Sequence, residues 1–88
     1  MPTISMFYGI IIRMYFGPKE HNPPHIHAYY QDDKATFSIN GSEMLTGKLP
    51  NRQTKMVEAW IEIHREELFA DWELCQNGEK PFKIDPLK

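Results

Sequence analysis

The spacing of the apolar residues changes once along this chain of 88 residues, and that change limits the folds it can adopt. In the first half apolar and polar residues alternate, as Ala35, Phe37 and Ile39 do, which is typical of a strand with one face in water. From about residue 51 to residue 77 they recur every three or four residues, as in an amphipathic helix. We therefore predict one α+β domain over residues 1–88, a two-layer fold. One layer is an antiparallel meander of about four to six short strands, and the other is a long C-terminal helix packed on one face of it.

Turn residues divide the first half into short strands, which we place at residues 4–8, 10–16, 25–30, 34–39 and 42–46. The even-numbered side chains of residues 10–16 are all apolar, so they should face the core. Asn40-Gly41 predicts a two-residue type I′ turn between the last two strands. Residues 81–87 alternate again, which predicts a final short strand.

A helix over residues 51–77 is about 39 Å long, enough to cross the sheet. Asn51, which follows Pro50, can cap its start, and Asn77-Gly78 is a favourable end. We expect its acidic residues to form a solvated side that repels nucleic acid: Glu58, Glu62, Glu66, Glu67, Asp71 and Glu73.

Charge and cysteine content indicate the setting of the protein. The net charge of −2 arises in residues 51–88, which carry six basic and eight acidic side chains, whereas residues 1–50 carry four of each. The single cysteine, Cys75, excludes an internal disulfide and fits a reducing compartment. No basic leader with a cleavage site and no apolar run of roughly 18–20 residues is present. We therefore expect a cytosolic protein that does not enter a membrane.

Three of the four histidines fall within the first seven residues of the segment HNPPHIHAYY, which starts at His21. Its two prolines favour an extended backbone, so we expect a strand to begin at His25. Because residues two apart on a strand share a face, His25, His27 and Tyr29 should point the same way. His21 would lie close by on the preceding loop.

This histidine cluster permits two kinds of chemistry. Imidazoles titrate near pH ~6.5, so His25 and His27 are candidate catalytic residues that act as general acid and base. Alternatively, a His-x-His pair with further histidines nearby has the geometry of a site for a divalent metal such as zinc. Its ligands would be His21, His25, His27 and His64, the last from the inner stripe of the helix.

Basic residues gather near the predicted start of the helix. Helix N-termini carry partial positive charge, so Arg52 and Lys55 there are each unfavourable by roughly 0.3–1 kcal/mol. A bound phosphate or carboxylate would relieve that repulsion. The candidate residues for binding nucleic acid or another anion are Arg13, Lys19, Lys48, Arg52 and Lys55.

Several segments together resemble the DUF4160 family of small prokaryotic proteins, which has no assigned activity. The matching segments are YGI at 8–10, HNPPHIHA at 21–28, GKLP at 47–50, VEAWI at 57–61 and IDPL at 84–87. Proteins of this kind are similar in size and setting to members of two-gene modules, often beside a second small family, DUF2442. The resemblance thus implies a toxin–antitoxin-like pairing with a small protein encoded next to it.

Residues and resemblance together predict a small cytosolic component of a toxin–antitoxin-like pair. Its histidine strand and the basic helix start would engage RNA, DNA or the partner protein. Two alternatives stay open: a metal-binding domain, with hydrolytic chemistry as an extension of it, and a non-catalytic protein-interaction module. The residues alone leave open whether the chain is an enzyme.

Overall fold

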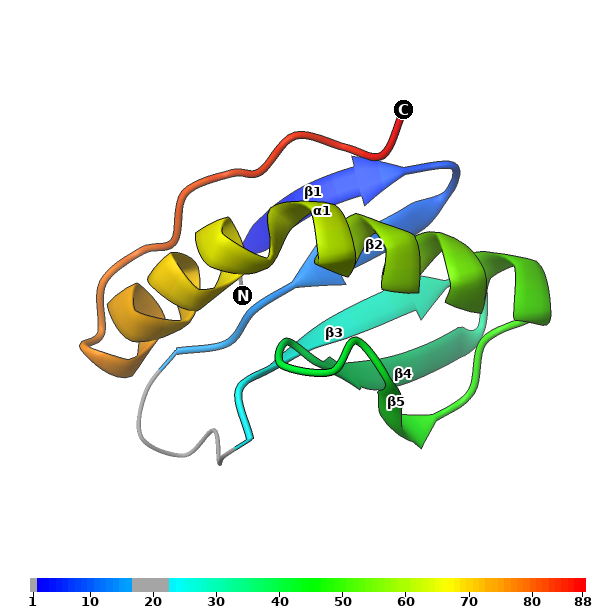
Figure 1. The fold of residues 1–88 in the computed structure, drawn as a ribbon, viewed down its shortest axis with the longest axis horizontal. Coiled ribbons are helices and arrows are strands. Elements are labelled where there is room, and N and C mark those ends of the chain that lie inside the picture. Colours follow the sequence, from blue (N-terminus) through cyan, green and yellow to red (C-terminus); the bar gives the residue numbers. More distant parts are fainter. Residues whose placement is uncertain (1, 17–22) are drawn as a thin grey trace.

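The computed structural model describes residues 2–16 and 23–88 (Figure 1). In this part of the chain five strands form one antiparallel sheet in chain order, and a long helix follows them. The elements are β1 (Thr3–Phe7), β2 (Ile10–Arg13), β3 (His25–Tyr30), β4 (Asp33–Ser38), β5 (Met44–Gly47) and α1 (Asn51–Gln76). The helix crosses one face of the sheet, so the predicted two-layer α+β fold is confirmed.

The apolar side chains that alternate along the strands and those that recur every three or four residues on the helix pack together in the core between the two layers. Strands β2, β3 and β4 each turn alternate apolar side chains toward the helix, among them Ile12, Ile26 and Phe37, and all of these are fully buried. The helix supplies the opposite wall through the predicted stripe, Val57, Trp60, Ile61, Leu68, Trp72 and Cys75. Burying each large apolar side chain stabilises the fold by about 1.5–3 kcal/mol.

Two tight turns fix the strand register. The predicted break between β3 and β4 is a two-residue turn, Gln31 and Asp32, with Gln31 at φ 53°, and the turn pairs Tyr30 with Asp33. Because side chains alternate along each strand, this pairing decides which residues of β3 and β4 lie side by side on each face. A similar turn at Tyr8 and Gly9 joins β1 to β2.

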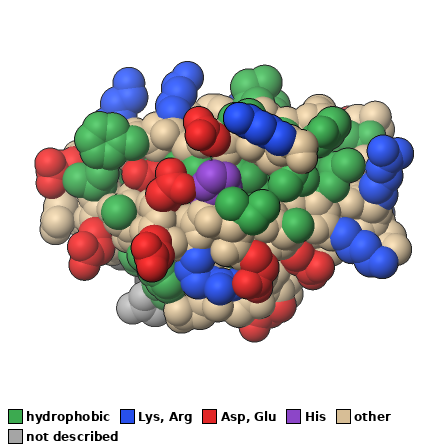
Figure 2. All heavy atoms as spheres, turned by 45° about the horizontal axis from the view of Figure 1, so that its top comes forward, with side chains coloured by type: hydrophobic (Ala, Val, Ile, Leu, Met, Phe, Trp, Pro, Cys, Tyr) green, Lys and Arg blue, Asp and Glu red, His purple; other side chains and the backbone are tan. Residues whose placement is uncertain are grey.

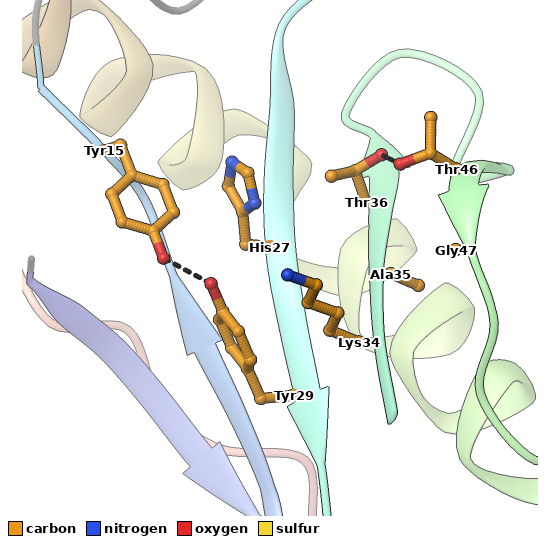
Figure 3. A pocket seen from close by; sticks show the side chains of 8 residues that line it. All are labelled: Tyr15, His27, Tyr29, Lys34, Ala35, Thr36, Thr46 and Gly47. Carbon is orange, nitrogen blue, oxygen red and sulfur yellow. Dashed lines mark hydrogen bonds between the residues drawn. The ribbon is translucent and has the colours of Figure 1, made fainter. Parts of the chain in front are cut away.

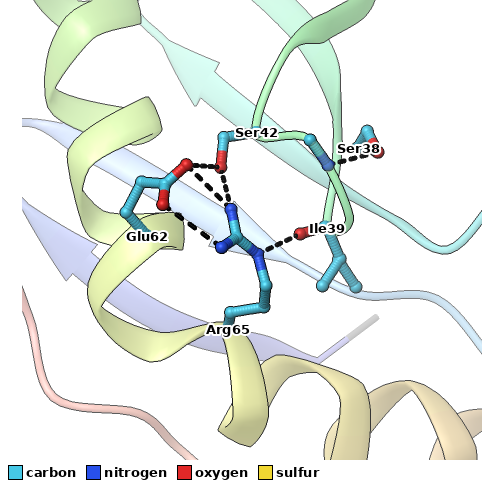
Figure 4. A network of polar contacts seen from close by, with 6 residues as sticks. Ser38, Ile39, Ser42, Glu62 and Arg65 are labelled. Carbon is cyan, nitrogen blue, oxygen red and sulfur yellow. Dashed lines mark hydrogen bonds and ion pairs between the residues drawn. The ribbon is translucent and has the colours of Figure 1, made fainter.

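The predicted two-residue turn at Asn40-Gly41 is wrong. The connection between β4 and β5 spans residues 39–43, and the left-handed residue in it is Ser42, at φ 65°. Figure 4 shows the reason: the Ser42 hydroxyl donates to Glu62 Oε2 (2.8 Å) and accepts from Arg65 Nη2 (2.6 Å). Arg65 Nε also donates to the carbonyl of Ile39 (2.9 Å). Contacts with the helix, rather than local turn preference, therefore set the shape of this loop.

Two further strand predictions need correction. Strand β2 ends at Arg13, and Phe16, which was expected in the core, is 43% exposed. Residues 81–87 alternate but are not a strand; they run beside β1 with one backbone hydrogen bond, from Ile84 N to Ile4 O (2.8 Å). Two prolines in this stretch have no N–H group, which leaves a poor partner for a β-ladder.

The helix departs from expectation at its start and on its outer side. Asn51 is its first residue rather than its cap; the cap position is Pro50, whose ring offers no side-chain cap, and the Thr54 hydroxyl donates to the Pro50 carbonyl (3.1 Å). The helix ends at Gln76 before Gly78, as predicted. Asp71, expected in water, is 2% exposed, and its Oδ1 accepts the Phe82 N–H (2.9 Å). Across the described residues, no helix combines the length and the apolar character that a membrane crossing requires.

Candidate functional site

The sheet has a second face, which none of the described elements covers; we call it the open face. Register pairs carry one row of side chains across all five strands, from Thr3 and Arg13 through His27 to Thr36 and Thr46. A second row joins Met6, Ile11, Tyr29 and Lys34. All of these residues are half-buried or exposed. The open face is therefore largely polar, and it carries two cations, Arg13 and Lys34.

A hollow of about 510 Å³ lies on the open face, a volume in the range of ligand pockets, roughly 300–1,000 Å³. Figure 3 shows its lining residues, which are Tyr15, His27, Tyr29, Lys34, Ala35, Thr36, Thr46 and Gly47. We call it the open-face hollow. The described residues that line it include no Asp or Glu, and the Lys34 side chain is directed from β4 toward β3.

Two tyrosines form one side of the hollow. The hydroxyls of Tyr15 and Tyr29 are hydrogen-bonded to each other, and the Tyr15 ring stands edge-on to His27, with centroids 4.4 Å apart and an interplanar angle of 88°. Burial and the hydrogen bond with Tyr29 raise the pKa of Tyr15 above its ordinary value. Tyr15 therefore stays a neutral phenol at physiological pH.

Arg13 supports the Tyr29 ring. Its guanidinium carbon lies 5.0 Å from the ring centroid, a cation–π contact. Tyr29 lines the hollow, whereas Arg13 is not among its described lining residues. Arg13 Nε is buried, with no hydrogen-bond partner in the structure as described.

The opposite side of the hollow depends on a close approach of β5 to β4. The hydroxyls of Thr36 and Thr46 lie 2.7 Å apart, in hydrogen-bonding contact. Next to them, Gly47 has a φ of 81°, and a Cβ there would lie 2.2 Å from the Lys34 carbonyl oxygen. That distance excludes any larger residue unless the backbone moves.

His25, His27 and Tyr29 alternate onto the same side of β3, as predicted, but His25 lies at the end of the strand and does not line the hollow. The His25 ring lies 5.2 Å from that of His27 and 5.1 Å from that of Trp72, a buried residue of α1, so it contacts the helix layer as well. His25 Nδ1 is 2.9 Å from the carbonyl oxygen of Pro23, so Nδ1 carries the proton and donates it there.

A family model described as a domain of unknown function, DUF4160, matches residues 9–73. The chain belongs to the DUF4160 family. The matched residues run from the start of β2 into the last part of α1 and include every described residue that lines the open-face hollow. No curated protein and no solved structure matches the chain.

Of the four histidines of the metal alternative, His25 and His27 lie beside each other on β3 of this DUF4160 chain, and His64 lies on α1. Across residues 2–16 and 23–88, no three His, Cys, Asp or Glu side chains lie close enough together to hold a metal ion. His64 belongs to the helix layer, with its Nδ1 2.6 Å from Glu67 Oε1 and its ring 5.5 Å from Trp60. The helix is kinked at His64, which has φ −111° and ψ 22°. His21 lies outside the described residues.

Four of the five predicted basic residues are divided between two places, and the fifth, Lys19, lies outside the described residues. Arg13 belongs to the open face, whereas Lys48, Arg52 and Lys55 are exposed around the start of α1. The first turn of the helix contains no acidic residue, as the sequence indicated.

The outer side of the helix differs in charge from the open face of the sheet. Figure 2 shows acidic side chains spread over this side of the DUF4160 chain, with lysines and arginines among them. Arg65 is ion-paired with Glu62 (2.8 Å), and this pairing lowers the pKa of the Glu62 carboxyl. The charge of Arg65 is thus balanced by a neighbouring carboxylate.

Sequence reasoning missed Tyr15, Lys34, Thr36, Thr46 and Gly47 as site residues. The pattern placed Lys34 and Thr36 on a wet face but did not connect that face to the histidines. The missing information is the register between β3 and β4. The two-residue turn at Gln31 and Asp32 sets this register, which pairs Tyr29 with Lys34 and His27 with Thr36.

Proposed function

We propose that this DUF4160 protein binds RNA on the open face of its sheet, as one component of a toxin–antitoxin-like two-gene module. The observation that carries this proposal is the open-face hollow, in which Tyr29, His27 and Lys34 come together and no carboxylate is among the described lining residues. Aromatic rings bind bases by stacking, and cations bind the phosphate backbone.

The distribution of charge supports one orientation for the RNA. Arg13 and Lys34 lie on the open face, whereas exposed glutamates such as Glu66 and Glu73 lie on the outer side of the helix. A polyanion is attracted to the first surface and repelled by the second. The exposed Lys48 and Arg52, near the end of β5, would extend the positive surface beyond the hollow.

The same surface supports RNA cleavage as a second candidate function, because two imidazoles lie 5.2 Å apart beside it. In this proposal His27 removes the proton of a ribose 2′-hydroxyl, and O2′ attacks the neighbouring phosphorus. The bond from phosphorus to O5′ breaks, and His25 in its protonated form gives a proton to O5′. The products are a 2′,3′-cyclic phosphate and a 5′-hydroxyl, formed without a metal or a cofactor.

The partner in such a module is proposed from the family resemblance: a small DUF2442-like protein encoded beside the gene. Such a partner would control access of RNA to the open face. A purified complex that no longer binds RNA would support this pairing, whereas a complex with unchanged RNA affinity would oppose it.

RNA binding is tested by fluorescence anisotropy with a labelled single-stranded RNA at about 50 and 200 mM salt. Lys34→Gln should weaken binding severalfold and lower the slope of log affinity against log salt by about 1, because one phosphate contact is lost. Lys80→Gln, an exposed lysine beyond the helix, is the matched control and should behave as wild type. No binding at the lower salt, or equal affinities for the two variants, contradicts the proposal.

Cleavage is tested on the same RNA with its 5′ end labelled. The wild-type protein should release fragments that end in a 2′,3′-cyclic phosphate, and the double variant His25→Ala and His27→Ala should not. RNA that binds and stays intact contradicts the cleavage proposal and leaves the binding proposal standing.

A further inference from the structure

We propose that the open-face hollow is a subsite for one unpaired base, so that the protein selects single-stranded RNA over duplex RNA. This inference rests on the proposed RNA binding and adds the class of RNA and the side chain that receives the base, Tyr29.

The Tyr29 ring is held in place for stacking. Its hydroxyl is hydrogen-bonded to Tyr15, and the Arg13 guanidinium carbon lies 5.0 Å from the ring centroid. The Tyr29 side chain also lines the hollow. A ring already fixed in this way loses little conformational entropy when a base stacks on it.

Hydrogen-bonding groups on β4 and β5 line the same hollow as Tyr29. The hydroxyls of Thr36 and Thr46 lie 2.7 Å apart and offer two donors between them, of which one is used in their mutual bond. The second donor and the remaining lone pairs can meet the edge of a base or a ribose 2′-hydroxyl. Lys34 is the register partner of Tyr29 on β4, so a phosphate next to the stacked base would lie within reach of its ammonium group.

The position of the hollow favours a single strand. It lies on β3, β4 and β5, on a face that no described element covers, so a strand of RNA can cross the sheet on both sides of it. In a duplex the bases are paired and stacked on one another, so a base has to leave its pair before it can stack on Tyr29. That cost is absent for a single strand.

The decisive experiment compares a labelled RNA octamer with the same octamer annealed to its complement, by anisotropy at fixed salt. The wild-type protein should bind the single strand at least tenfold more tightly. Tyr29→Leu should weaken single-strand binding about tenfold, which corresponds to one lost base–aromatic stack. Tyr8→Leu is the matched control, since Tyr8 is exposed in the β1–β2 turn and does not line the hollow; it should bind as wild type.

Tyr29→Phe separates stacking from folding, because it keeps the ring and loses the hydroxyl. It should retain most of the affinity that Tyr29→Leu loses, and circular dichroism should show all three variants folded. If Tyr29→Leu does not fold, Lys34→Gln and the pair Thr36→Val and Thr46→Val test the same hollow, and each should weaken single-strand binding. Equal affinity for single strand and duplex overturns the subsite but not RNA binding, as does an unchanged affinity in Tyr29→Leu. Absence of all RNA binding removes the proposed function and the subsite together.

Discussion

The two faces of the sheet are made from alternate residues of the same strands, yet they differ in burial and in polarity. On the covered face Ile12, Ile26 and Phe37 are fully buried against the helix. On the open face their chain neighbours include His27 and Thr36, which are half-buried and polar. Burial of apolar side chains on the covered face therefore stabilises the fold, and the open face is available to bind a ligand.

This difference implies that stability and binding can be changed separately. Substitutions on the covered face should unfold the protein with no specific effect on its ligand, and substitutions on the open face should do the reverse. Gly47 belongs to neither face, because its role is to let β5 approach β4 closely. Each variant below tests this separation.

The largest effect is expected for Trp60→Ala on the covered side. Trp60 is fully buried, its ring lies 5.4 Å from that of Phe7, and its Nε1–H donates to the carbonyl of Asp85 (2.8 Å). Loss of a buried tryptophan costs about 3–5 kcal/mol, a large share of the ~5–15 kcal/mol that holds a small domain together. Chemical denaturation should show this loss, or a chain that is already unfolded. A Trp60→Ala variant as stable as Tyr29→Leu would contradict the separation of the two faces.

Gly47→Ala should have the next largest effect. The left-handed backbone costs a residue with a Cβ about 1–2 kcal/mol, and the clash with Lys34 O and Ala35 Cα adds about 1–3 kcal/mol. The control is Gly78→Ala, which has nearly the same φ, 78°, and no atom within 4 Å of the added Cβ. Its free energy of unfolding should fall by the backbone cost alone. Equal losses in the two variants would show that β5 can move away from β4, and the open-face hollow would then not be rigid.

Asp71→Asn should raise the free energy of unfolding at neutral pH. The gain should be smaller than the losses expected for Trp60→Ala and Gly47→Ala. Burial raises the pKa of the Asp71 carboxyl, and the nearby Glu67 adds to the shift. The folded state therefore favours the protonated carboxyl: its contribution is fully present below the unfolded pKa, ~3.9, and is lost as pH rises through the folded value. An asparagine keeps an oxygen that can accept the Phe82 N–H and cannot ionise.

The measurement is the free energy of unfolding between about pH 4 and 7. Wild type should lose stability relative to Asp71→Asn as the pH rises. Glu73→Gln, an exposed carboxyl on the same helix, is the control and should follow wild type. A constant difference between wild type and Asp71→Asn across this range would show that Asp71 does not titrate there. Cys75, close to Asp71, has its pKa raised to about 11 by burial and so does not contribute in this range.

Most of the fold could be predicted because it follows from periodicity, which is local. Alternation predicted the meander and which side chains of β2 and β4 are buried, and the three- to four-residue spacing predicted α1 to within a residue at its end. The errors arise where contacts with residues far away in the sequence determine the local structure or the burial of a side chain. The β4–β5 loop follows the contacts of Ser42 with Arg65, 23 residues away, and Asp71 is buried because residues around Phe82 fold back over it.

The candidate site could be predicted only in part, for a similar reason. Alternation within β3 placed His25, His27 and Tyr29 together. The rest of the hollow requires pairing between strands, which a one-residue slip would change completely. Gly47 shows this most clearly: its role depends on the distance to Lys34 O in another strand, which no property of the local sequence reports.

The smallest effect on stability is expected for the double variant Thr36→Val and Thr46→Val on the open face. Valine has nearly the shape of threonine and favours strands, and the hydroxyl pair is exposed, so the free energy of unfolding should change by less than about 0.5 kcal/mol. Affinity for single-stranded RNA should nevertheless fall severalfold, because a donor and its lone pairs are lost from the hollow. Urea denaturation and anisotropy on the same samples measure both quantities. A variant that loses stability and keeps its affinity would reverse the assignment of the two faces, since the hydroxyl pair would then hold the sheet together rather than receive a ligand.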